Sequence, residues 1–437
     1  MSSFLNARID SLAIGGNGVC RINGKVCFVP FACPGDLLAL EITSEKKSYL
    51  TARIAAILEP SQSRVTPLCP VFGRCGGCAW QHIDYSCQLE QKYQMFSEAL
   101  WRGARVDSAV ISPVVPAPSP FGYRGRVQLK LYGGGTRLQI GFFRHGSHFV
   151  EDTPCGCPVA RLPINHAMGQ LRDVLARFSG VGQIPQINLE AGDQGLVATV
   201  NYIGPDRAQA IDFFTSERQR LSELSGVWLQ SGRKSSLMHI WGDKLLFYGM
   251  PTGERHQEMS LEFAPGGFSQ VNFQQNRIMS GLIRRMVRES KSKRLLDLYC
   301  GNGNFSLPLA SDVISVTGVE SYSGSIISAQ ANCHRNSVDN AAYLCADSSA
   351  AVSELVRNGM RFDTIILDPP RAGAADVIDS LCTVCPSTII YISCDPSTLA
   401  RDCGILAGRG FKVTESVPVD MFPQTPHLES VTMLKAV

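Results

Sequence analysis

Cys394 lies between an apolar run, residues 388–392, and Pro396-Ser397-Thr398, a pattern that predicts the start of a helix. A strand that ends at a helix N-terminus places its last side chain at the positive end of the helix dipole. That position favours the thiolate, which is the nucleophilic form of cysteine. We therefore predict that Cys394 is a nucleophile. The alternative, for a cysteine taken alone, is an inert buried thiol.

A glycine-rich turn follows another predicted strand, residues 294–298. The strand carries Asp297 and leads into Gly301-Asn302-Gly303-Asn304-Phe305-Ser306, which we expect to open a helix. Such a turn lets a nucleotide-like ligand approach the backbone closely. A dinucleotide fingerprint needs a third glycine where Ser306 stands, so the pattern, with Asp297, favours S-adenosylmethionine (SAM) over NAD.

Acidic residues follow the next three predicted strands. Glu320 follows residues 313–319, Asp347 follows 343–346, and Asp368, in Asp-Pro-Pro-Arg, follows 364–367. The carboxyl ends of parallel strands meet at one edge of a sheet, where open α/β folds bind their ligands. We expect Glu320 to accept hydrogen bonds from the ribose of SAM and Asp347 to lie beside the adenine. Taken singly, each acid is also explained as a helix cap or a solvated carboxylate.

Cysteines also cluster in the first half of the chain. Cys69, Cys75 and Cys78 lie close together, and Cys155 and Cys157 form a distant pair. In Cys75-Gly-Gly-Cys78 the glycines let the backbone fold around a metal centre and direct N–H groups at sulfur. Three close thiols and one remote thiol predict a [4Fe–4S] cluster. Zinc remains the competing interpretation.

The composition limits the class of protein. The 437 residues are too many for one core and predict two to three domains. The net charge of +3, from 41 Lys and Arg against 38 Asp and Glu, is too small to indicate nucleic-acid binding by itself. The first residues lack the apolar core of a signal peptide, and no apolar run is long enough for a bilayer. We expect a cytoplasmic protein whose sixteen cysteines are reduced.

Short β-rich runs separated by glycine turns fill residues 9–59. About five short strands in this length predict a small barrel of the OB type, a fold that often binds oligonucleotides. Lys46, Lys47 and Arg53 are candidate contacts to an RNA backbone. The alternative is a spacer barrel with a solvated basic loop.

The middle of the chain offers a helix and a basic strand. Residues 88–102 form an amphipathic helix pattern, and 123–132 alternate so that Arg124, Arg126 and Lys130 share one face. Basic residues interleaved with aromatic ones are typical of RNA-binding surfaces. A solvated sheet face explains the strand equally well.

Four motifs, in order, resemble the RNA (uracil-5-)-methyltransferases: Gly-x-Gly-Asn-Phe, Asp-Pro-Pro-Arg-x-Gly, Ser-Cys-Asp-Pro-x-Thr-Leu-x-Arg-Asp, and His427-Leu428-Glu429-Ser430. With the cysteines and a barrel that resembles a TRAM domain, the chain is most similar to the iron–sulfur branch that acts on 23S rRNA. Asp395 and Tyr299 stand where Asn and Phe are common in that family. Neither difference touches the reacting atoms.

The resemblance implies roles for individual residues. Cys394 would be the nucleophile, Glu429 the general base, and Phe268 a stacking partner for the target base, which must leave its stack. The implied SAM contacts are Gln270, Tyr299, Asn304, Glu320, Asp347 and Asp368. The implied cluster ligands are Cys69, Cys75, Cys78 and Cys157, with Cys157 preferred to Cys155 because the family shows Cys-Pro there.

We therefore expect a multidomain α/β protein. It would comprise a TRAM-like OB barrel (1–60), an iron–sulfur and RNA-binding region (61–267) whose helix 88–102 packs on the catalytic domain, and a Rossmann-like SAM-dependent methyltransferase domain (268–437). The expected activity is C5-methylation of a uridine in 23S rRNA by a monomer without a protein partner. The alternatives are the same chemistry on the T-loop of tRNA, a catalytically inactive RNA-binding protein, and an iron–sulfur electron carrier, which would lack a second redox site.

Overall fold

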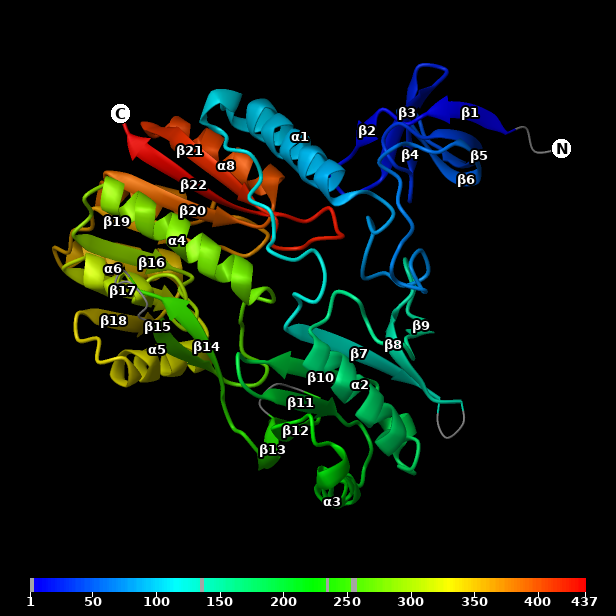
Figure 1. The fold of residues 1–437 in the computed structure, drawn as a ribbon. Coiled ribbons are helices and arrows are strands. Elements are labelled where there is room, and N and C mark those ends of the chain that lie inside the picture. Colours follow the sequence, from blue (N-terminus) through cyan, green and yellow to red (C-terminus); the bar gives the residue numbers. More distant parts are fainter. Residues whose placement is uncertain (1–3, 134–136, 233–235, 253–257) are drawn as a thin grey trace.

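The computed structural model describes residues 4–133, 137–232, 236–252 and 258–437. The chain forms three large sheets and one separate hairpin (Figure 1). Among the described residues, no helix has the length and apolar character needed to cross a bilayer.

The N-terminal sheet has six strands in the order β1-β5-β6-β4-β3-β2. The short strands predicted within residues 9–59 are present here, and Asn23 and Gly24, both with positive φ, form the turn between β3 and β4. The strands are β1 (Leu5–Arg8), β2 (Ser11–Leu12), β3 (Gly18–Ile22), β4 (Lys25–Val29), β5 (Leu37–Glu45) and β6 (Tyr49–Glu59).

Helix α1 (Tyr85–Ala104) connects this sheet to the rest of the molecule, and it is longer at both ends than the predicted 88–102. Asp84 caps its N-terminus by accepting from the Ser86 N–H (3.0 Å). The helix lies between the N-terminal strands and α8 (Pro396–Ala407), against which it packs (Figure 1). At this crossing a Cβ on Gly103 would lie 2.7 Å from the Cβ of Ala400, so the glycine allows the two helices to approach closely.

The central sheet has seven strands in the order β13-β12-β11-β10-β7-β8-β9. Helices α2 (Leu162–Leu175) and α3 (Arg207–Ser216) pack against it in one apolar core. The short 3-10 helices η3 (Val181–Gln183) and η4 (Arg218–Arg220) lie in its connections, whereas η1 (Ser108–Val110), between α1 and β7 in the chain, contacts β21 (Phe411–Val419). The strands are β7 (Arg126–Tyr132), β8 (Gln139–Phe143), β9 (Val150–Asp152), β10 (Gln186–Ala191), β11 (Leu196–Asn201), β12 (Gly226–Gln230) and β13 (Met238–Gly242).

The hairpin β14 (Leu246–Pro251) and β15 (Glu258–Phe263) stands apart from the central sheet. It contacts α4 (Phe273–Glu289) and α5 (Ser323–Arg335). Tyr248 stacks on Phe273 with ring centroids 5.3 Å apart. Residues before 268 therefore share a core with the C-terminal part, although the proposed domain division lies at 267/268.

The C-terminal sheet has seven strands in the order β18-β17-β16-β19-β20-β22-β21. All neighbours are parallel except β22, which runs antiparallel to both β20 and β21. The strands are β16 (Arg294–Leu298), β17 (Ser315–Glu320), β18 (Ala341–Cys345), β19 (Thr364–Leu367), β20 (Thr388–Ser393), β21 (Phe411–Val419) and β22 (Glu429–Ala436).

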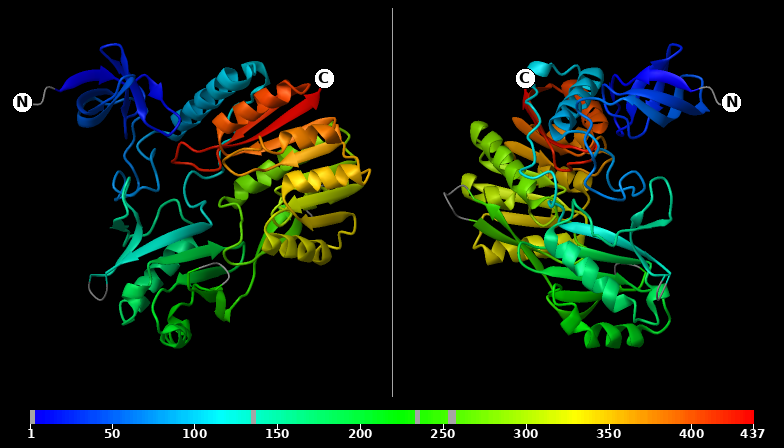
Figure 2. Two further views of the ribbon diagram at one scale, coloured as in Figure 1. Left: turned by 180° about the vertical axis from the view of Figure 1, so that it is seen from behind. Right: turned by 45° about the vertical axis from the view of Figure 1, so that its right-hand side comes forward.

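Helices cover both faces of this sheet (Figure 2). Leu296, Ile365 and Ile389 face a core shared with α6 (Ser348–Arg357), α7 (Ile378–Val384), α8 and α1. Ile366 and Ile390, one position along, face the core that contains α4. Strands buried on both sides explain the continuous apolar runs in the sequence.

The glycine-rich turn differs from its prediction. Residues 299–306 form turns that lead into a 3-10 helix, η6 (Leu307–Asp312), rather than an α-helix. Asp312, the last residue of this segment, forms an ion pair with Arg284 of α4 (2.9 Å).

Candidate active site at the carboxyl edge of the sheet

The pairing of β20 with β22 brings Cys394 and Glu429 to the same end of the sheet. Ser393 and Ser430 are direct partners in this antiparallel ladder. Cys394 follows Ser393 and Glu429 precedes Ser430, so the register sets the two predicted catalytic residues side by side at the ladder's end. Glu429 is 7% exposed and Cys394 is half-buried.

Burial raises the pKa of the Cys394 thiol to about 11, and the nearby Glu429 carboxylate adds to this shift. This differs from the expectation that the helix dipole would favour the thiolate. The main reason is the burial of the thiol. The N-terminus of α8 is also capped already, because the Asp395 carboxylate accepts from the N–H groups of Ser397 (2.8 Å) and Thr398 (3.0 Å). A negative cap offsets the positive end of the helix.

Glu429 lies in an acidic and enclosed environment. Burial raises its pKa well above the usual range, and the charge of Asp368 acts in the same direction. Burial and then the charge of Glu320 raise the pKa of Asp368 to about 7. Each of these groups thus shifts the pKa of a neighbour through its charge. Glu320, Asp368, Glu429 and Cys394 therefore form one electrostatically coupled row along the edge.

Arg371 is a residue of this group that the sequence reasoning did not assign. Its charge lowers the pKa values of both Cys394 and Glu429, opposing their burial. It directly follows Asp368-Pro369-Pro370, so its position in that motif was the available signal.

The other predicted SAM contacts that follow strands lie at the same edge. Tyr299 follows β16 in the left-handed region (φ 63°), and Glu320 ends β17. Glu320 Oε1 accepts from the Tyr322 N–H (2.8 Å). Asp347 is exposed and caps α6, because its Oδ1 accepts from the Ala350 N–H (3.0 Å). One of its two carboxylate oxygens therefore has the alternative role of a helix cap.

Asn304 has a structural role that the sequence did not indicate. Its side chain exchanges two hydrogen bonds with Asn276 of α4 (2.8 and 2.9 Å), and its Oδ1 also accepts from the Tyr248 hydroxyl (3.0 Å). These contacts fasten the glycine-rich turn to α4 and to the hairpin. Gln270 is buried before α4, whereas Phe268 is 60% exposed.

Four cysteines of the first half of the chain line one cavity of about 300 Å³. Its wall includes Cys69, Cys75, Cys78 and Cys157, whereas Cys155 is exposed. The Gly77 N–H points at Cys75 Sγ (3.4 Å), as expected for a glycine in this motif. Across the described ranges, no three His, Cys, Asp or Glu side chains are arranged to hold a metal ion.

The predicted basic face of strand 123–132 is partly used inside the protein. The strand begins only at Arg126, which forms an ion pair with Glu190 (2.9 Å) and donates to the Gly267 carbonyl (2.7 Å). Arg124 lies outside the strand and lines the cysteine cavity. The third basic residue, Lys130, donates a hydrogen bond to Gln186 and lies over the Phe143 ring.

Comparison with known proteins assigns this arrangement to a family. Residues 253–437 match the family model described as tRNA (Uracil-5-)-methyltransferase. The chain is 33% identical to the 23S rRNA (uracil(1939)-C(5))-methyltransferase RlmD of Thiobacillus denitrificans, with 99% of this chain and 100% of that protein aligned. The chain belongs to the RNA (uracil-5-)-methyltransferase family.

Other members of the family agree with this assignment. RlmD of Mannheimia succiniciproducens is 34% identical, with 99% of this chain and 96% of that protein aligned. The crystal structure of Pyrococcus abyssi tRNA (uracil-54, C5)-methyltransferase in complex with S-adenosyl-L-homocysteine has a TM-score of 0.76 and 26% identity, over 98% of this chain and 100% of that chain. This chain is therefore a SAM-dependent RNA (uracil-C5)-methyltransferase with a mixed α/β, multidomain fold.

Proposed function

We propose that this enzyme methylates C5 of a specific uridine in 23S rRNA, in the cytoplasm and as a monomer. The choice of substrate rests on similarity to proteins named as 23S rRNA (uracil(1939)-C(5))-methyltransferases. This similarity extends over essentially the whole chain. The T-loop of tRNA is the second candidate, because the P. abyssi enzyme of similar fold is named for tRNA.

In the proposed first step, the Cys394 thiolate adds to C6 of uracil. Uracil C5 is a poor nucleophile, and addition at C6 forms an enolate that places electron density on C5. The thiol first gives its proton to water, a step that its raised pKa opposes and the positive charge of Arg371 favours. C5 then takes the methyl group that SAM supplies.

The second step removes the proton that remains on C5. Glu429 accepts this proton, the C5–H electrons form the C5–C6 double bond, and the C6–S bond breaks to return the Cys394 thiolate. A buried carboxylate whose pKa is raised well above its usual range is a stronger base than a solvated one. The β20–β22 register supports this assignment because it sets Glu429 beside the cysteine.

The SAM site lies along the same edge in this proposal, with contacts from Gln270, Tyr299, Asn304, Glu320, Asp347 and Asp368. The contribution of Asn304 would come through its backbone, because its side chain is engaged with Asn276 and Tyr248. Phe268, exposed just before α4, would stack on the extruded uracil.

We propose further that Cys69, Cys75, Cys78 and Cys157 hold a [4Fe–4S] cluster. The four thiols line one cavity of about 300 Å³, which has room for a group larger than a single ion. Backbone N–H groups are directed at Cys75 and Cys157. The cluster would be structural, folding an RNA-binding lobe (61–267) beside a TRAM-like barrel (1–60) and the methyltransferase domain (268–437).

Nucleoside mass spectrometry tests the substrate. Unmodified 23S rRNA and tRNA transcripts are each incubated anaerobically with the enzyme and SAM. We expect 5-methyluridine in 23S rRNA alone. Product in tRNA alone would keep the chemistry and change the substrate, and product in neither would contradict methylation of the free RNA.

A further inference from the structure

The strands β21 and β22 are joined by residues 420–428, which we call the 420–428 loop. Val419 and Glu429, at its two ends, are direct partners in the ladder. The loop thus begins and ends at the catalytic edge, and its conformation sets where the backbone delivers Glu429.

Groups outside the loop hold its backbone along most of its length. The carbonyl oxygens of residues 420 to 424 all accept hydrogen bonds from elsewhere in the chain. The donors are, in order, Gln275 Nε2 (2.9 Å), Asn272 Nδ2 (3.3 Å), Lys92 Nζ (3.1 Å), the Tyr123 hydroxyl (3.0 Å), and the N–H groups of Ala79 and Trp80 (3.1 and 3.0 Å).

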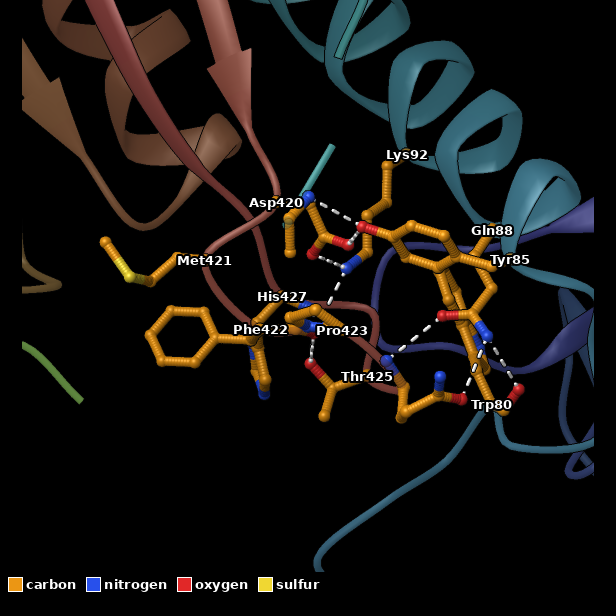
Figure 3. Close-up of polar contacts among 12 residues, drawn as sticks. Trp80, Tyr85, Gln88, Lys92, Asp420, Met421, Phe422, Pro423, Thr425 and His427 are labelled. Carbon is orange, nitrogen blue, oxygen red and sulfur yellow. Dashed lines mark hydrogen bonds and ion pairs between the residues drawn. The ribbon is translucent and has the colours of Figure 1, made fainter. Parts of the chain in front are cut away.

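One face of α1 also contacts the loop through side chains. Tyr85, Gln88 and Lys92 recur at helical spacing and point toward the loop (Figure 3). The Tyr85 hydroxyl donates to Asp420 Oδ2 (2.8 Å), and Lys92 forms an ion pair with Asp420 in which both side chains are 0% exposed.

Gln88 is the central contact. Its Oε1 accepts from the Gln424 N–H (3.0 Å) and its Nε2 donates to Gln424 Oε1 (3.0 Å), while the same Nε2 also donates to the carbonyls of Trp80 and Ile83. Gln88 is 0% exposed, and Gln424 has a φ of 69°, in the left-handed region. A non-glycine residue in that region persists only where its surroundings hold it.

We propose that Gln88 is a positioning residue for removal of the C5 proton: through Gln424 it holds the 420–428 loop, and the loop holds Glu429. This inference rests on the proposed role of Glu429 as the base. Proton abstraction depends steeply on geometry, because a shift of about 1 Å in a catalytic group can cost about 100-fold in rate. Cys394, which adds to C6, is positioned by β20 and α8. Neither element supplies the hydrogen bonds described here that hold the 420–428 loop.

The helix offers a matched control, Gln91. Gln91 is the same residue type on the same helix and is also buried. Its side chain accepts from the Leu12 N–H of the N-terminal sheet (2.9 Å) instead of holding the 420–428 loop. Methionine keeps the length of glutamine without its amide, so Gln88→Met and Gln91→Met form the pair. Tyr123→Phe, which removes the hydroxyl that donates to the Pro423 carbonyl, is the second test variant should Gln88→Met fold poorly.

The experiment uses full-length enzyme, methyl-labelled SAM and the transcript that wild-type enzyme methylates. Rapid-quench samples on denaturing gels separate methylated protein–RNA adduct from released product. A second transcript carries 5-fluorouridine, whose C5 has no proton to remove, so that its trapping reports only addition and methyl transfer. Glu429→Gln is measured in parallel.

For Gln88→Met we expect product release to fall at least about tenfold, with accumulation of methylated adduct. Trapping on the fluorinated RNA should stay within about threefold of wild type, and Gln91→Met should match wild type in both assays. Normal release by Gln88→Met, or an equal fall in release and trapping, would overturn the inference. If Glu429→Gln accumulates adduct while Gln88→Met does not, only the positioning role fails. If Glu429→Gln releases product normally, the base assignment fails, and the inference with it.

Discussion

Lys92 and Asp420 form an ion pair, with Nζ 2.5 Å from Oδ1, in which neither side chain reaches solvent. The two residues lie 328 positions apart in the chain and join α1 to the loop before Glu429. Removing one partner of such a pair leaves an uncompensated buried charge. We expect Lys92→Met to lower the free energy of unfolding by about 3–5 kcal/mol, measured by urea denaturation.

The control for this measurement is Lys25→Met. Lys25 pairs with Glu45 on the surface, with 38% and 64% of the two side chains exposed. Exposed pairs contribute at most about 1 kcal/mol, so the urea midpoint should barely change. Equal effects of the two substitutions would show that the buried pair does not support the fold.

Cys394→Ala should abolish 5-methyluridine formation and leave SAM affinity largely intact, because in the proposed mechanism the thiolate adds to uracil and does not contact SAM. The matched control is Cys403→Ala, which removes a thiol from the same helix, α8, that is 1% exposed in the core. The control should retain turnover. Substantial turnover by Cys394→Ala, checked by calorimetry to bind SAM, would remove Cys394 from the nucleophile role.

The rate of addition to uracil should rise with pH. The pKa of Cys394 is raised to about 11, so at neutral pH only a small fraction of the enzyme carries the thiolate. Below its pKa that fraction grows about tenfold per pH unit, and we expect the rate of trapping on 5-fluorouridine RNA to follow it from pH 6.5 to 8.5. Glu429→Gln removes a negative neighbour and should raise the rate, least at the low end of that range, because the raised pKa of Glu429 keeps more of this carboxyl group neutral there. A flat profile would mean that RNA binding itself lowers the pKa.

Glu320→Gln should weaken SAM binding. In the proposed SAM site the Glu320 carboxylate would accept charge-assisted hydrogen bonds from the ribose hydroxyls. Each such bond contributes about 1.5–3 kcal/mol, so the dissociation constant should rise about 10- to 100-fold in calorimetry. Glu354→Gln on the exposed face of α6 is the control and should bind SAM normally. Unchanged affinity in Glu320→Gln would place the ribose elsewhere along the edge.

The fourth ligand of the proposed cluster can be decided by comparing Cys157→Ser with Cys155→Ser. Cys157 lines the cysteine cavity and Cys155 is exposed. After anaerobic purification, Cys157→Ser should lose iron, acid-labile sulfide and visible absorption, whereas Cys155→Ser should keep all three. If the wild-type protein contains zinc and no acid-labile sulfide, the cluster proposal is wrong and the cysteines form a zinc site.

The sequence by itself determined the residues at the strand ends. Glu320, Asp347, Asp368 and Cys394 each follow an apolar run that became a strand, and a parallel sheet must place such ends at one edge. These predictions succeeded because strand periodicity and turn chemistry act over a few neighbouring residues. The same local patterns indicated most strands of the N-terminal sheet and the core of α1.

Only the tertiary structure decided how distant segments meet. Antiparallel β22 sets Glu429 beside Cys394, α1 holds the 420–428 loop through Gln88 and Lys92, and burial raises the pKa of the Cys394 thiol. Each of these depends on contacts or burial that arise when the chain packs. Local periodicity carries no information about such contacts, because either partner alone is an ordinary polar residue.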